Sequence, residues 1–478
     1  MYDIIIIGAG IIGTMVAREL SRYQASVLVI EKDNDVGNRT TNANSAIVHS
    51  GYDPVPGTLK AKFNVLGNKM FDQLCDELDV PMYRIGSLTV ALYDEQLPLL
   101  HSLAERSKEN GVEVKLLSAE EAKTLEPNIN PCVKGALLAP SAGIVDPFNL
   151  CVHAMENAID NGVILKRNTK VIDIKKDGEI FKIFTNNGEF SGKIVINCAG
   201  VYSDKIAQMV EEIDWKITPR KGEYFVLDHY KEGLVNHTIF PLPSEKGKGI
   251  LVSPTSSGNY IMGPSSEEVP DKEDVSTDKP TLDMVRKGAL DMVPSIPLNQ
   301  VIRVFSGLRA TCTRHDFIIE PAKSDDHFIN VAGIESPGLV SSPAIGKYVA
   351  EELVRPILNL EKKEHFSPNV RKYHRLYYAL NEQSFDYINK HPDYAEVVCN
   401  CEMVTLGEIK DVLSRSCPPV SVKGVKRRTR AGYGRCQGGF CQPRIVLLLA
   451  KHYGISPLEV PLDNEGSNIL LEKIKNVK

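Results

Sequence analysis

Four cysteines near the end of the chain form two close pairs. One residue separates Cys399 from Cys401, and four residues separate Cys436 from Cys441. Four thiolates in two pairs can bind Zn²⁺ or a [2Fe–2S] cluster, although a one-residue gap is unusual in structural zinc sites. In a reducing compartment, such pairs indicate metal or redox chemistry rather than a disulfide framework.

Three glycines near the N-terminus have the spacing of a dinucleotide-binding turn. Gly8, Gly10 and Gly13 follow the apolar run 4–7 and open a helical pattern that extends to about Tyr23. Gly8 allows a tight turn, Gly10 lets a pyrophosphate approach the backbone, and Gly13 lets the helix pack closely on the strand. The free N–H groups and positive dipole end of the helix would face the phosphates.

An acidic residue completes this pattern. The apolar strand expected over 27–30 ends at Glu31, which lies 18 residues after Gly13 (31 − 13 = 18). Its carboxylate can accept hydrogen bonds from ribose hydroxyls. We therefore predict a nucleotide site built on a βαβ unit. Further contacts to the nucleotide are expected from Ile12, Lys32 and Thr41.

The composition sets broad limits on what the chain can do. It has 478 residues, a formal net charge of −5 and a pI near 6.2. This length predicts two or three domains, and the charge gives no basic footprint for nucleic acid. No stretch reaches the roughly 18 uninterrupted apolar residues of a membrane span. We expect a cytoplasmic protein, with peripheral membrane contact left open.

The elements expected further along the chain indicate an α/β fold with a second domain. Apolar strands are expected within 193–200 and 328–334, where the chain would return to the first sheet. Between them, 215–305 holds short strand-like runs punctuated by Pro and Gly. Such runs are typical of an antiparallel sheet, and we place a substrate-covering domain there.

This order of elements resembles the glutathione-reductase-like FAD fold. A long polar loop over 34–57 follows the first βαβ unit, and the chain returns to the nucleotide fold only late. The resemblance is to the branch shared by D-amino-acid oxidase and glycerol-3-phosphate dehydrogenase. In that branch the stretch "FINVAGIESPGL" lies beside the flavin ring. The resemblance implies FAD contacts at Val171, Ala199, Gly200, Gly333, Gly338, Leu339 and Val340.

The segment "TTNANSAIVHSGYDPVPGTLKAKFNVLGN" (40–68) narrows the resemblance. It is similar to FAD-linked type 2 glycerol-3-phosphate oxidases and dehydrogenases, and to the related L-2-hydroxyglutarate oxidases. The likeness runs on through "RKGEYFVLD", "FSGLRA" and "GIESPGLVSSPAIGKYVAEEL", and so covers about 1–355. It implies a catalytic role for His49 and Arg309. Positions near the substrate are implied for Ser45, Lys248, Arg309 and Ser336, with Ser45 also near the flavin.

The chemistry of the two catalytic candidates fits oxidation of an alcohol that carries a negative charge. A histidine near its working pKa can take the hydroxyl proton while hydride leaves the carbon. The planar guanidinium of Arg309 suits a phosphate or a carboxylate and does not distinguish between them. The alternatives are a surface or core histidine for His49 and a structural salt bridge for Arg309.

The cysteine-containing region has a resemblance of its own. "VTLGEI" after the first pair and "RTRAGYGRCQGGFC" through the second resemble the bacterioferritin-associated-ferredoxin-like [2Fe–2S] domain. The resemblance implies a [2Fe–2S] cluster on Cys399, Cys401, Cys436 and Cys441, with zinc or unligated thiols as the alternatives. Cys417 is expected to be a spare buried thiol. The basic run 423–435 has two interpretations: a solvated face, or a surface that tunes the cluster or docks an electron carrier.

Together these features predict FAD-dependent oxidation of sn-glycerol 3-phosphate to dihydroxyacetone phosphate, with electrons passed to the cluster or to an external acceptor protein. The alternatives are a 2-hydroxy-acid dehydrogenase such as one for L-2-hydroxyglutarate, an amine oxidase of the same fold, and a non-catalytic electron-transfer subunit. The oxidoreductase region is expected over 1–355, with FAD parts at 1–80, 145–210 and 305–355 and substrate parts at 81–144 and 211–304. A linker (356–395), a ferredoxin-like helical module (396–453) and a tail (454–478) follow.

Overall fold

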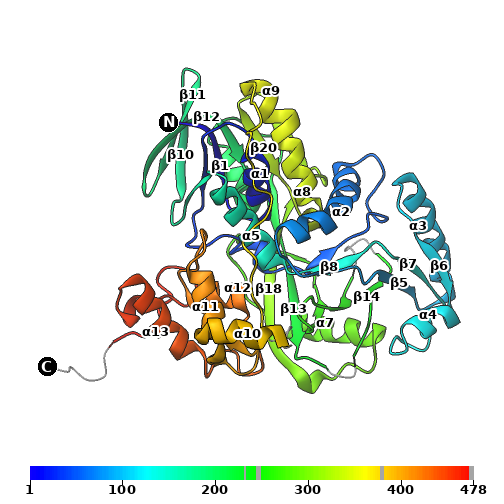
Figure 1. Cartoon of the computed structure of the whole chain (residues 1–478). Coiled ribbons are helices and arrows are strands. Elements are labelled where there is room, and N and C mark those ends of the chain that lie inside the picture. The colour runs from blue at the N-terminus through cyan, green and yellow to red at the C-terminus, as the bar shows by residue number, and fades with distance from the viewer. Residues whose placement is uncertain (231–232, 244–248, 377–381, 473–478) are drawn as a thin grey trace.

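Two large sheets and a small helical module make up the chain (Figure 1). The computed structural model describes residues 1–230, 233–243, 249–376 and 382–472. The two sheets lie side by side, and the helical module packs against both of them at the C-terminal end of the chain. The mixed α/β architecture agrees with the fold class expected from the sequence.

The first sheet has eight strands and a parallel centre. β1 (Tyr2–Ile7) pairs in parallel with β2 (Val27–Ile30) on one side and β12 (Gly188–Asn197) on the other. The four isoleucines of β1 are 0 to 5% exposed, as a strand covered on both faces requires. The remaining strands are β9 (Ile164–Lys166), β10 (Val171–Asp177), β11 (Ile180–Thr185), β19 (Ile318–Pro321) and β20 (Phe328–Ala332).

Four helices form the main packing layer against this sheet. α1 (Ile11–Leu20) lies between α5 (Pro147–Asp160) and α8 (Gly338–Tyr348), and α2 (Leu59–Glu77) packs on α8. The expected helices to about Tyr23 and over 58–79 correspond to α1 and α2. α8 continues through a π-helical turn (Val349–Val354) into α9 (Arg355–Leu358), while α6 (Ser203–Ala207) follows β12.

The second sheet has nine strands drawn from two distant parts of the chain. β13 (Ile217–Leu227) and β18 (Val301–Cys312) form a long antiparallel pair, and β5 (Ser87–Ala91) joins through β14 (Thr238–Pro241). The other strands are β6 (Lys115–Ser118), β7 (Gly135–Ala139), β15 (Leu251–Pro254), β16 (Tyr260–Gly263) and β17 (Glu267–Glu268). Its helices are α3 (Leu97–Glu109), α4 (Ala119–Leu125) and α7 (Lys279–Met292).

Two details of this sheet differ from the expectation. β14 and β5 run parallel, so the sheet is mixed rather than wholly antiparallel. β18 also remains paired with β13 as far as Cys312, beyond the boundary expected at 304. A continuous ladder of backbone hydrogen bonds holds the strand in this sheet, and the chain crosses to the first sheet only at β19.

A three-stranded sheet lies between the two large ones. β3 (Ile47–Val48) and β4 (Met82–Tyr83) pair with opposite edges of β8 (Gly143–Val145). All the residues of β3 and β8 are buried. This small sheet fixes the segment that enters it, residues 43–49, at the junction of the two large sheets.

The C-terminal module (residues 397–469) has an apolar core of its own. Ile409, Val425 and Ile445 are at most 1% exposed at its centre. Val460 and Ile469, in the expected tail, also pack on this core. The elements are β21 (Val397–Cys399), β22 (Val404–Thr405), α11 (Leu406–Leu413), α12 (Val422–Thr429) and α13 (Gln442–Tyr453), with α10 (Glu382–Lys390) preceding them.

The basic run 423–435 attaches this module to the rest of the chain. Arg428 forms a buried ion pair with Asp35 of the first sheet region, and Arg435 pairs with Asp228 after β13 at 2.7 Å. Arg430 donates to Asn259 Oδ1 at 2.7 Å. The interpretation of the run as a solvated face does not hold for Arg428, because its guanidinium is 1% exposed and paired internally with Asp35.

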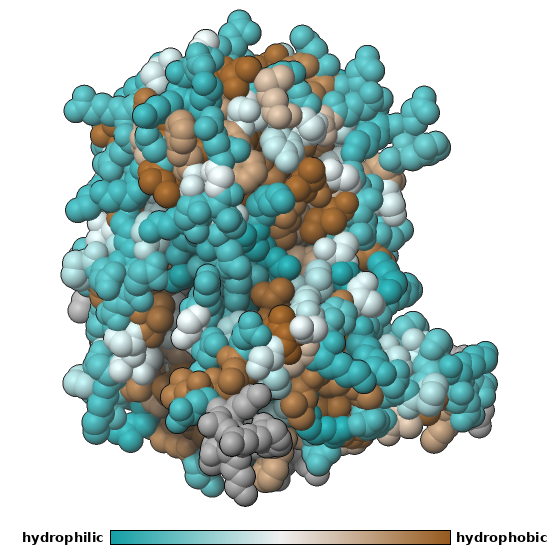
Figure 2. All heavy atoms as spheres, turned by 90° about the vertical axis from the view of Figure 1, so that its left-hand side faces the viewer, coloured by the Kyte–Doolittle hydropathy of each residue, from teal (hydrophilic) through white to brown (hydrophobic). Residues whose placement is uncertain are grey.

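The outer surface is mixed in character. On the face shown in Figure 2, hydrophilic residues predominate and hydrophobic residues gather in separate patches. Scattered apolar residues of this kind are normal on a protein surface. In the part of the chain that the structure describes, no helix has the length and apolar character needed to cross a membrane.

Candidate functional site

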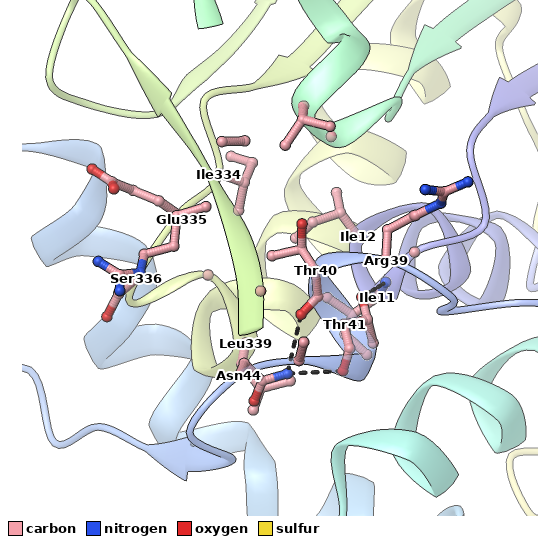
Figure 3. Close-up of a pocket in the computed structure, with 18 of the residues that line it drawn as sticks. Ile11, Ile12, Arg39, Thr40, Thr41, Asn44, Ile334, Glu335, Ser336 and Leu339 are labelled. Atoms are coloured by element: carbon pink, nitrogen blue, oxygen red, sulfur yellow. Dashed lines mark hydrogen bonds between the residues drawn. The ribbon is translucent and has the colours of Figure 1, made fainter. Parts of the chain in front are cut away.

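A cavity of about 1220 Å³ lies at the junction of the sheets. Its walls come from the turn between β1 and α1, the loop after β2, the segment 39–49, strands β13 and β18, and the segment 334–339. Figure 3 shows Ile334, Glu335 and Ser336 on the opposite side of the view from Ile11 and Arg39. A cavity of this size can take a ligand as large as a dinucleotide together with a small substrate.

The three glycines of the first turn have distinct structural roles. Gly8 has a φ of +102°, and a Cβ placed on it would lie 2.5 Å from the Cys198 carbonyl oxygen. A Cβ on Gly13 would lie 2.0 Å from the Gly8 carbonyl oxygen, so glycine is required there for packing. At Gly10 the nearest atom is Thr41 Oγ1 at 3.5 Å, which leaves its backbone open to the cavity. This open backbone fits a pyrophosphate.

Glu31 lies at the same end of the cavity. Its Oε2 accepts from the Ala9 N–H at 2.7 Å, and its Oε1 accepts from the Asp33 N–H at 2.9 Å. Burial, reinforced by the nearby Asp33, raises the pKa of Glu31 to about 7. Hydroxyl donors from a ribose would stabilise the charged form of this carboxyl group. The Glu31 carboxylate, as a hydrogen-bond acceptor at this position, therefore fits the ribose of the adenosine part of FAD.

The segment between Arg39 and Ser45 forms the inner wall. Thr41 Oγ1 accepts from the Ile11 N–H at 3.0 Å, which ties this segment to the start of α1. Asn44 Nδ2 donates to the carbonyl oxygens of Thr40 and Thr41 at 3.4 and 2.8 Å (Figure 3). The predicted cofactor residues that line the cavity are Gly8, Gly10, Ile12, Glu31, Lys32, Thr41, Ser45, Val171, Ala199, Gly200, Gly338 and Leu339.

Three predicted cofactor residues lie outside the lining. Gly13 faces the β1 turn, as described above. Gly333 has a φ of +65° and abuts Cys312, whose Cβ would lie 2.9 Å from a Cβ at that position. Val340 is fully buried in the core between α8 and α2, where a Cβ on Gly67 would come within 1.9 Å of its carbonyl oxygen. These positions support the site through packing. Lys248, predicted for the substrate, lies outside the described residues.

His49 follows β3 and lines the cavity. Its backbone carbonyl accepts hydrogen bonds from Asn64 Nδ2 at 2.8 Å and from Asn68 Nδ2 at 2.9 Å, both on α2. Its ring lies 5.9 Å from that of Phe240 on β14. Two asparagines of α2 thus fix the backbone of His49 while its imidazole stands at the cavity wall.

Arg309 on β18 reaches the same cavity. Its Nη2 donates to the Ser265 carbonyl at 2.6 Å, and the guanidinium occupies space that a Cβ on Gly222 would enter at 2.3 Å. Within the described residues, no carboxylate forms an ion pair with Arg309. Burial lowers the pKa of this guanidinium, and Arg220 lowers it further. An anion in the cavity would therefore relieve an unfavourable charge.

A cationic cluster that the sequence reasoning did not identify surrounds Glu335. Lys60 Nζ contacts Glu335 Oε1 at 2.9 Å, and Arg220 Nη2 contacts Oε2 at 2.6 Å. With Arg309, three cations face one carboxylate, which leaves a local excess of positive charge. Lys60 and Arg220 stood within the quoted motifs "PGTLKAKF" and "RKGEYFVLD", but only the folded chain brings them together.

The two predicted serines also line the cavity. Ser45 Oγ lies 3.1 Å from the hydroxyl of Tyr224, another residue that sequence reasoning missed. The Tyr224 ring stacks on Phe305 with centroids 4.6 Å apart, which fixes its orientation. Ser336 lies beside Glu335 at the end nearest α8 (Figure 3).

The four cysteines of the module gather as two pairs. Cys401 Sγ and Cys436 Sγ are 3.6 Å apart, and Cys399 contacts Cys441 through a hydrogen bond. A single Zn²⁺ with bonds of about 2.3 Å would bring all four sulfurs to about 3.8 Å from one another. Among the described residues, no three of these sulfurs lie within 4.8 Å of one another. Two separated pairs suit a cluster of two irons better than one zinc ion.

Backbone groups also point at these sulfurs. Cys399 receives hydrogen bonds from the backbone of Gly432 and Glu402, and Cys436 from the backbone of Phe440. Such bonds favour the thiolate form that binds iron. Cys417, expected to be spare, is 1% exposed and packs in the core below the first sheet.

Aromatic side chains lie between the thiol site and the cavity region. Tyr433 follows Gly432, and its ring centroid lies 5.8 Å from that of Phe148 at the start of α5. α5 in turn packs against the short 3₁₀ turn η1 (Thr40–Asn42) of the cavity wall. The thiol site is thus joined to the cavity wall by packed side chains and a helix.

Comparison with known proteins gives two family matches. Residues 3–352 match the FAD dependent oxidoreductase family, and residues 397–451 match the BFD-like [2Fe-2S] binding domain. A relative described as glycerol 3-phosphate dehydrogenase, from Caloramator mitchellensis, is 45% identical over 477 residues. That match covers 100% of this chain and 99% of the relative. Glycerol 3-phosphate oxidase of Mycoplasma genitalium is 36% identical over 77% of this chain and 97% of its own length.

A solved structure has the same fold over the region of the two large sheets. The dithionite-reduced L-alpha-glycerophosphate oxidase from Mycoplasma pneumoniae, with FAD bound, superimposes with a TM-score of 0.73 at 34% identity. The match covers 77% of this chain and 98% of that one. The expected glutathione-reductase-like fold, the FAD and the [2Fe–2S] domain are confirmed by these matches.

Proposed function

We propose that this chain, which belongs to the family of FAD-dependent oxidoreductases, oxidises sn-glycerol 3-phosphate to dihydroxyacetone phosphate. The observation that carries the proposal is the cationic cluster in the same cavity as His49. It favours a small anion as the substrate, but suits a carboxylate as well as a phosphate. The glycerol 3-phosphate dehydrogenase that matches this chain over its whole length supports glycerol 3-phosphate over a 2-hydroxy acid.

The role of His49 follows from what an alcohol oxidation requires. A bound FAD supplies the two-electron acceptor for the hydride that leaves the carbinol carbon. The hydroxyl proton must leave at the same time, and an imidazole can accept it near neutral pH. His49 takes this proton in the proposal. The hydrogen bonds from Asn64 and Asn68 to its backbone support a fixed position.

In the proposal, the cations of the same cavity hold the phosphate. Arg309 offers a guanidinium that lacks a carboxylate partner within the described chain, and Lys60 and Arg220 add further charge. Glu335 orients Lys60 and Arg220, and its negative charge lowers the net positive charge of the cluster. Fixing the phosphate places the carbinol carbon relative to the flavin, which lowers the entropic part of the barrier.

The cysteine pairs give the electrons a route onward. A [2Fe–2S] cluster accepts one electron at a time, and Cys399, Cys401, Cys436 and Cys441 hold it in the proposal. The packed aromatic pair Tyr433 and Phe148 supports a short route from the cavity wall. The final acceptor is then an external electron-carrier protein. We keep the prediction of a cytoplasmic location, because cysteines that are not joined in disulfides suit a reducing compartment.

Anaerobic flavin bleaching with a panel of substrates tests the proposal. Glycerol 3-phosphate should bleach the flavin at a rate at least tenfold above L-2-hydroxyglutarate, glycine and glycerol, because only it offers both a phosphate and a secondary alcohol. Bleaching by the hydroxy acid alone would identify a 2-hydroxy-acid dehydrogenase. Bleaching by none of the four would point to an electron-transfer subunit.

A further inference from the structure

The loop that follows β2 has two faces with different neighbours. We name residues 33–39 the nucleotide loop, because Asp33, Gly37, Asn38 and Arg39 line the cavity at the end where Glu31 lies. The opposite face of the same loop contacts the C-terminal module. A segment that faces the cofactor is thus held from behind by a different domain.

A buried ion pair forms the centre of this contact. Arg428 Nη1 and Nη2 donate to the two carboxylate oxygens of Asp35 at 2.7 and 2.8 Å. The side chains are 1% and 0% exposed. Burial alone would raise the pKa of Asp35, but Arg428 and Arg427 hold it at about 2. A two-point pair of this kind fixes direction as well as distance.

Two hydrogen bonds flank the ion pair. Asn34 Nδ2 donates to the Asp463 carbonyl at 2.5 Å, and Asn38 Nδ2 donates to Asn464 Oδ1 at 3.0 Å. The backbone of α12 approaches the nucleotide loop closely, because a Cβ on Gly424 would lie 3.0 Å from Asp35 Oδ2. The module therefore contacts the nucleotide loop at three successive points along its length.

The cavity side of the loop is connected to the rest of the site. The Gly37 N–H donates to the Ala9 carbonyl at 2.9 Å, beside the first glycine turn. Arg39 forms a two-point pair with Asp33 at 2.6 and 2.8 Å. Because Asp33 also donates its N–H to Glu31, a shift of the loop would be transmitted to the carboxylate that faces the ribose.

We propose that the C-terminal module is part of the FAD-binding device, and that Arg428 is a positioning residue that holds the nucleotide loop in its FAD-competent conformation. The module then has two functions, one in electron transfer and one in retaining the flavin. This inference concerns FAD alone, so its failure would leave the substrate proposed above unaffected, and the reverse also holds.

A purely structural pair would behave differently from a positioning pair. If Arg428 only docks the module, its loss would lower stability without a specific effect on FAD. Arg415 provides the comparison: it forms a buried ion pair between the module and α5, with Glu156 at 3.2 Å, and both side chains are 3% exposed. Neither partner belongs to the nucleotide loop.

The test compares FAD release from two holoenzyme variants, Arg428→Met and Arg415→Met. Both are purified anaerobically, and flavin fluorescence follows FAD release after dilution. We expect Arg428→Met to release FAD about 5- to 150-fold faster than the parent protein, the usual range of coupling between sites. Arg415→Met should stay within about twofold of the parent, because neither Arg415 nor Glu156 contacts the nucleotide loop. Iron and acid-labile sulfide should remain at the parent level in both.

Two results would overturn the proposal. One is an unchanged rate of FAD release in Arg428→Met with its iron retained, and the other is an equal acceleration in both variants. If Arg428→Met fails to fold, Asn464→Ala serves instead, because it removes only the partly buried hydrogen bond from Asn38. It should accelerate release by about two- to tenfold, the value of one hydrogen bond, and an unchanged rate there would also contradict the proposal.

Discussion

At the scale of single residues, the cavity combines one imidazole with an excess of positive charge. His49 stands at the wall on a backbone fixed by two asparagines of α2. Arg309, Lys60 and Arg220 supply the cations, and Glu335 is the carboxylate among them. In the proposed mechanism, His49 takes the proton and the cations bind the substrate, so the two functions can be tested one residue at a time.

Replacement of His49 tests the proton-transfer role. We expect His49→Ala to lower the rate of flavin reduction by roughly 10²–10⁴, the usual value of a general base. FAD should stay bound, because the nucleotide contacts lie elsewhere. Stopped-flow reduction by glycerol 3-phosphate measures the effect. A rate equal to that of the parent protein would remove His49 from the mechanism.

The pKa of Glu31 makes FAD binding dependent on pH. In the unliganded protein, burial and Asp33 raise this pKa to about 7, whereas ribose hydroxyls favour the ionised form. Below pH 7 the carboxyl must lose a proton on binding, so affinity should rise with pH and level off above 7. Between pH 6 and 8 the gain should be about tenfold. Equilibrium titration with FAD measures it, and Glu31→Gln should give a flat profile.

Single residues could be predicted where a motif marks them. The spacing of Gly10, Glu31 and the thiol pairs is typical of nucleotide-binding and cluster-binding motifs, so the sequence alone predicts a role for each. Lys60 and Arg220 could not be found in the same way, because they are 160 positions apart (220 − 60 = 160). Only the pairing of strands and helices brings them to Glu335.

At the scale of elements, close approach between backbones decides where glycine is needed. Two glycines of the first turn can be compared directly. The space beside Gly10 is open, whereas a Cβ on Gly13 would clash with the Gly8 carbonyl oxygen. The strands 4–7 and 27–30 could be predicted from local apolar runs. The parallel pairing of β14 with β5 could not, because it joins segments about 150 residues apart (238 − 87 = 151).

Alanine at each of these glycines should therefore have a different effect. Gly13→Ala should lower the free energy of unfolding by about 1–3 kcal/mol or more, through overpacking against the β1 turn. Gly10→Ala should fold normally but bind FAD more weakly, because its methyl group enters the cavity. Urea denaturation and FAD titration separate the two outcomes. Equal loss of stability in both variants would contradict this assignment.

Gly222 tests how β13 positions Arg309. A Cβ there would lie 2.3 Å from Arg309 Nη2, so Gly222→Ala should displace the guanidinium. We expect kcat/KM for glycerol 3-phosphate to fall by tenfold or more, since small displacements in a site are costly. FAD affinity should not change. Steady-state kinetics with an artificial acceptor would reveal a normal kcat/KM if Arg309 does not bind the substrate.

At the scale of the whole molecule, the thiol module is built into the enzyme rather than appended to it. Its basic run holds Asp35, Asp228 and Asn259, which belong to both large regions. The sequence indicated the module and the cysteines proposed as its ligands, because they lie close together in the chain. The docking could not be predicted, because a basic run is usually solvated and its acidic partners lie hundreds of residues away.

Removal of one thiol should separate the two half-reactions. Cys401→Ser should lose most of the iron and acid-labile sulfide, since serine is a poor ligand for the cluster. Flavin reduction by glycerol 3-phosphate should continue at a rate near that of the parent protein. Exposed Cys132 provides the control, and Cys132→Ser should keep its iron. Full iron content in Cys401→Ser would contradict the assigned ligand set.

The central claim is that one chain takes electrons from glycerol 3-phosphate and passes them to its own cluster. Rapid freeze-quench electron paramagnetic resonance tests it most directly, after anaerobic mixing of the holoenzyme with one equivalent of glycerol 3-phosphate. We predict that the flavin is reduced first and that the signal of a reduced [2Fe–2S] cluster then grows. A flavin that stays oxidised, or a cluster that stays oxidised beside a reduced flavin, would contradict the account.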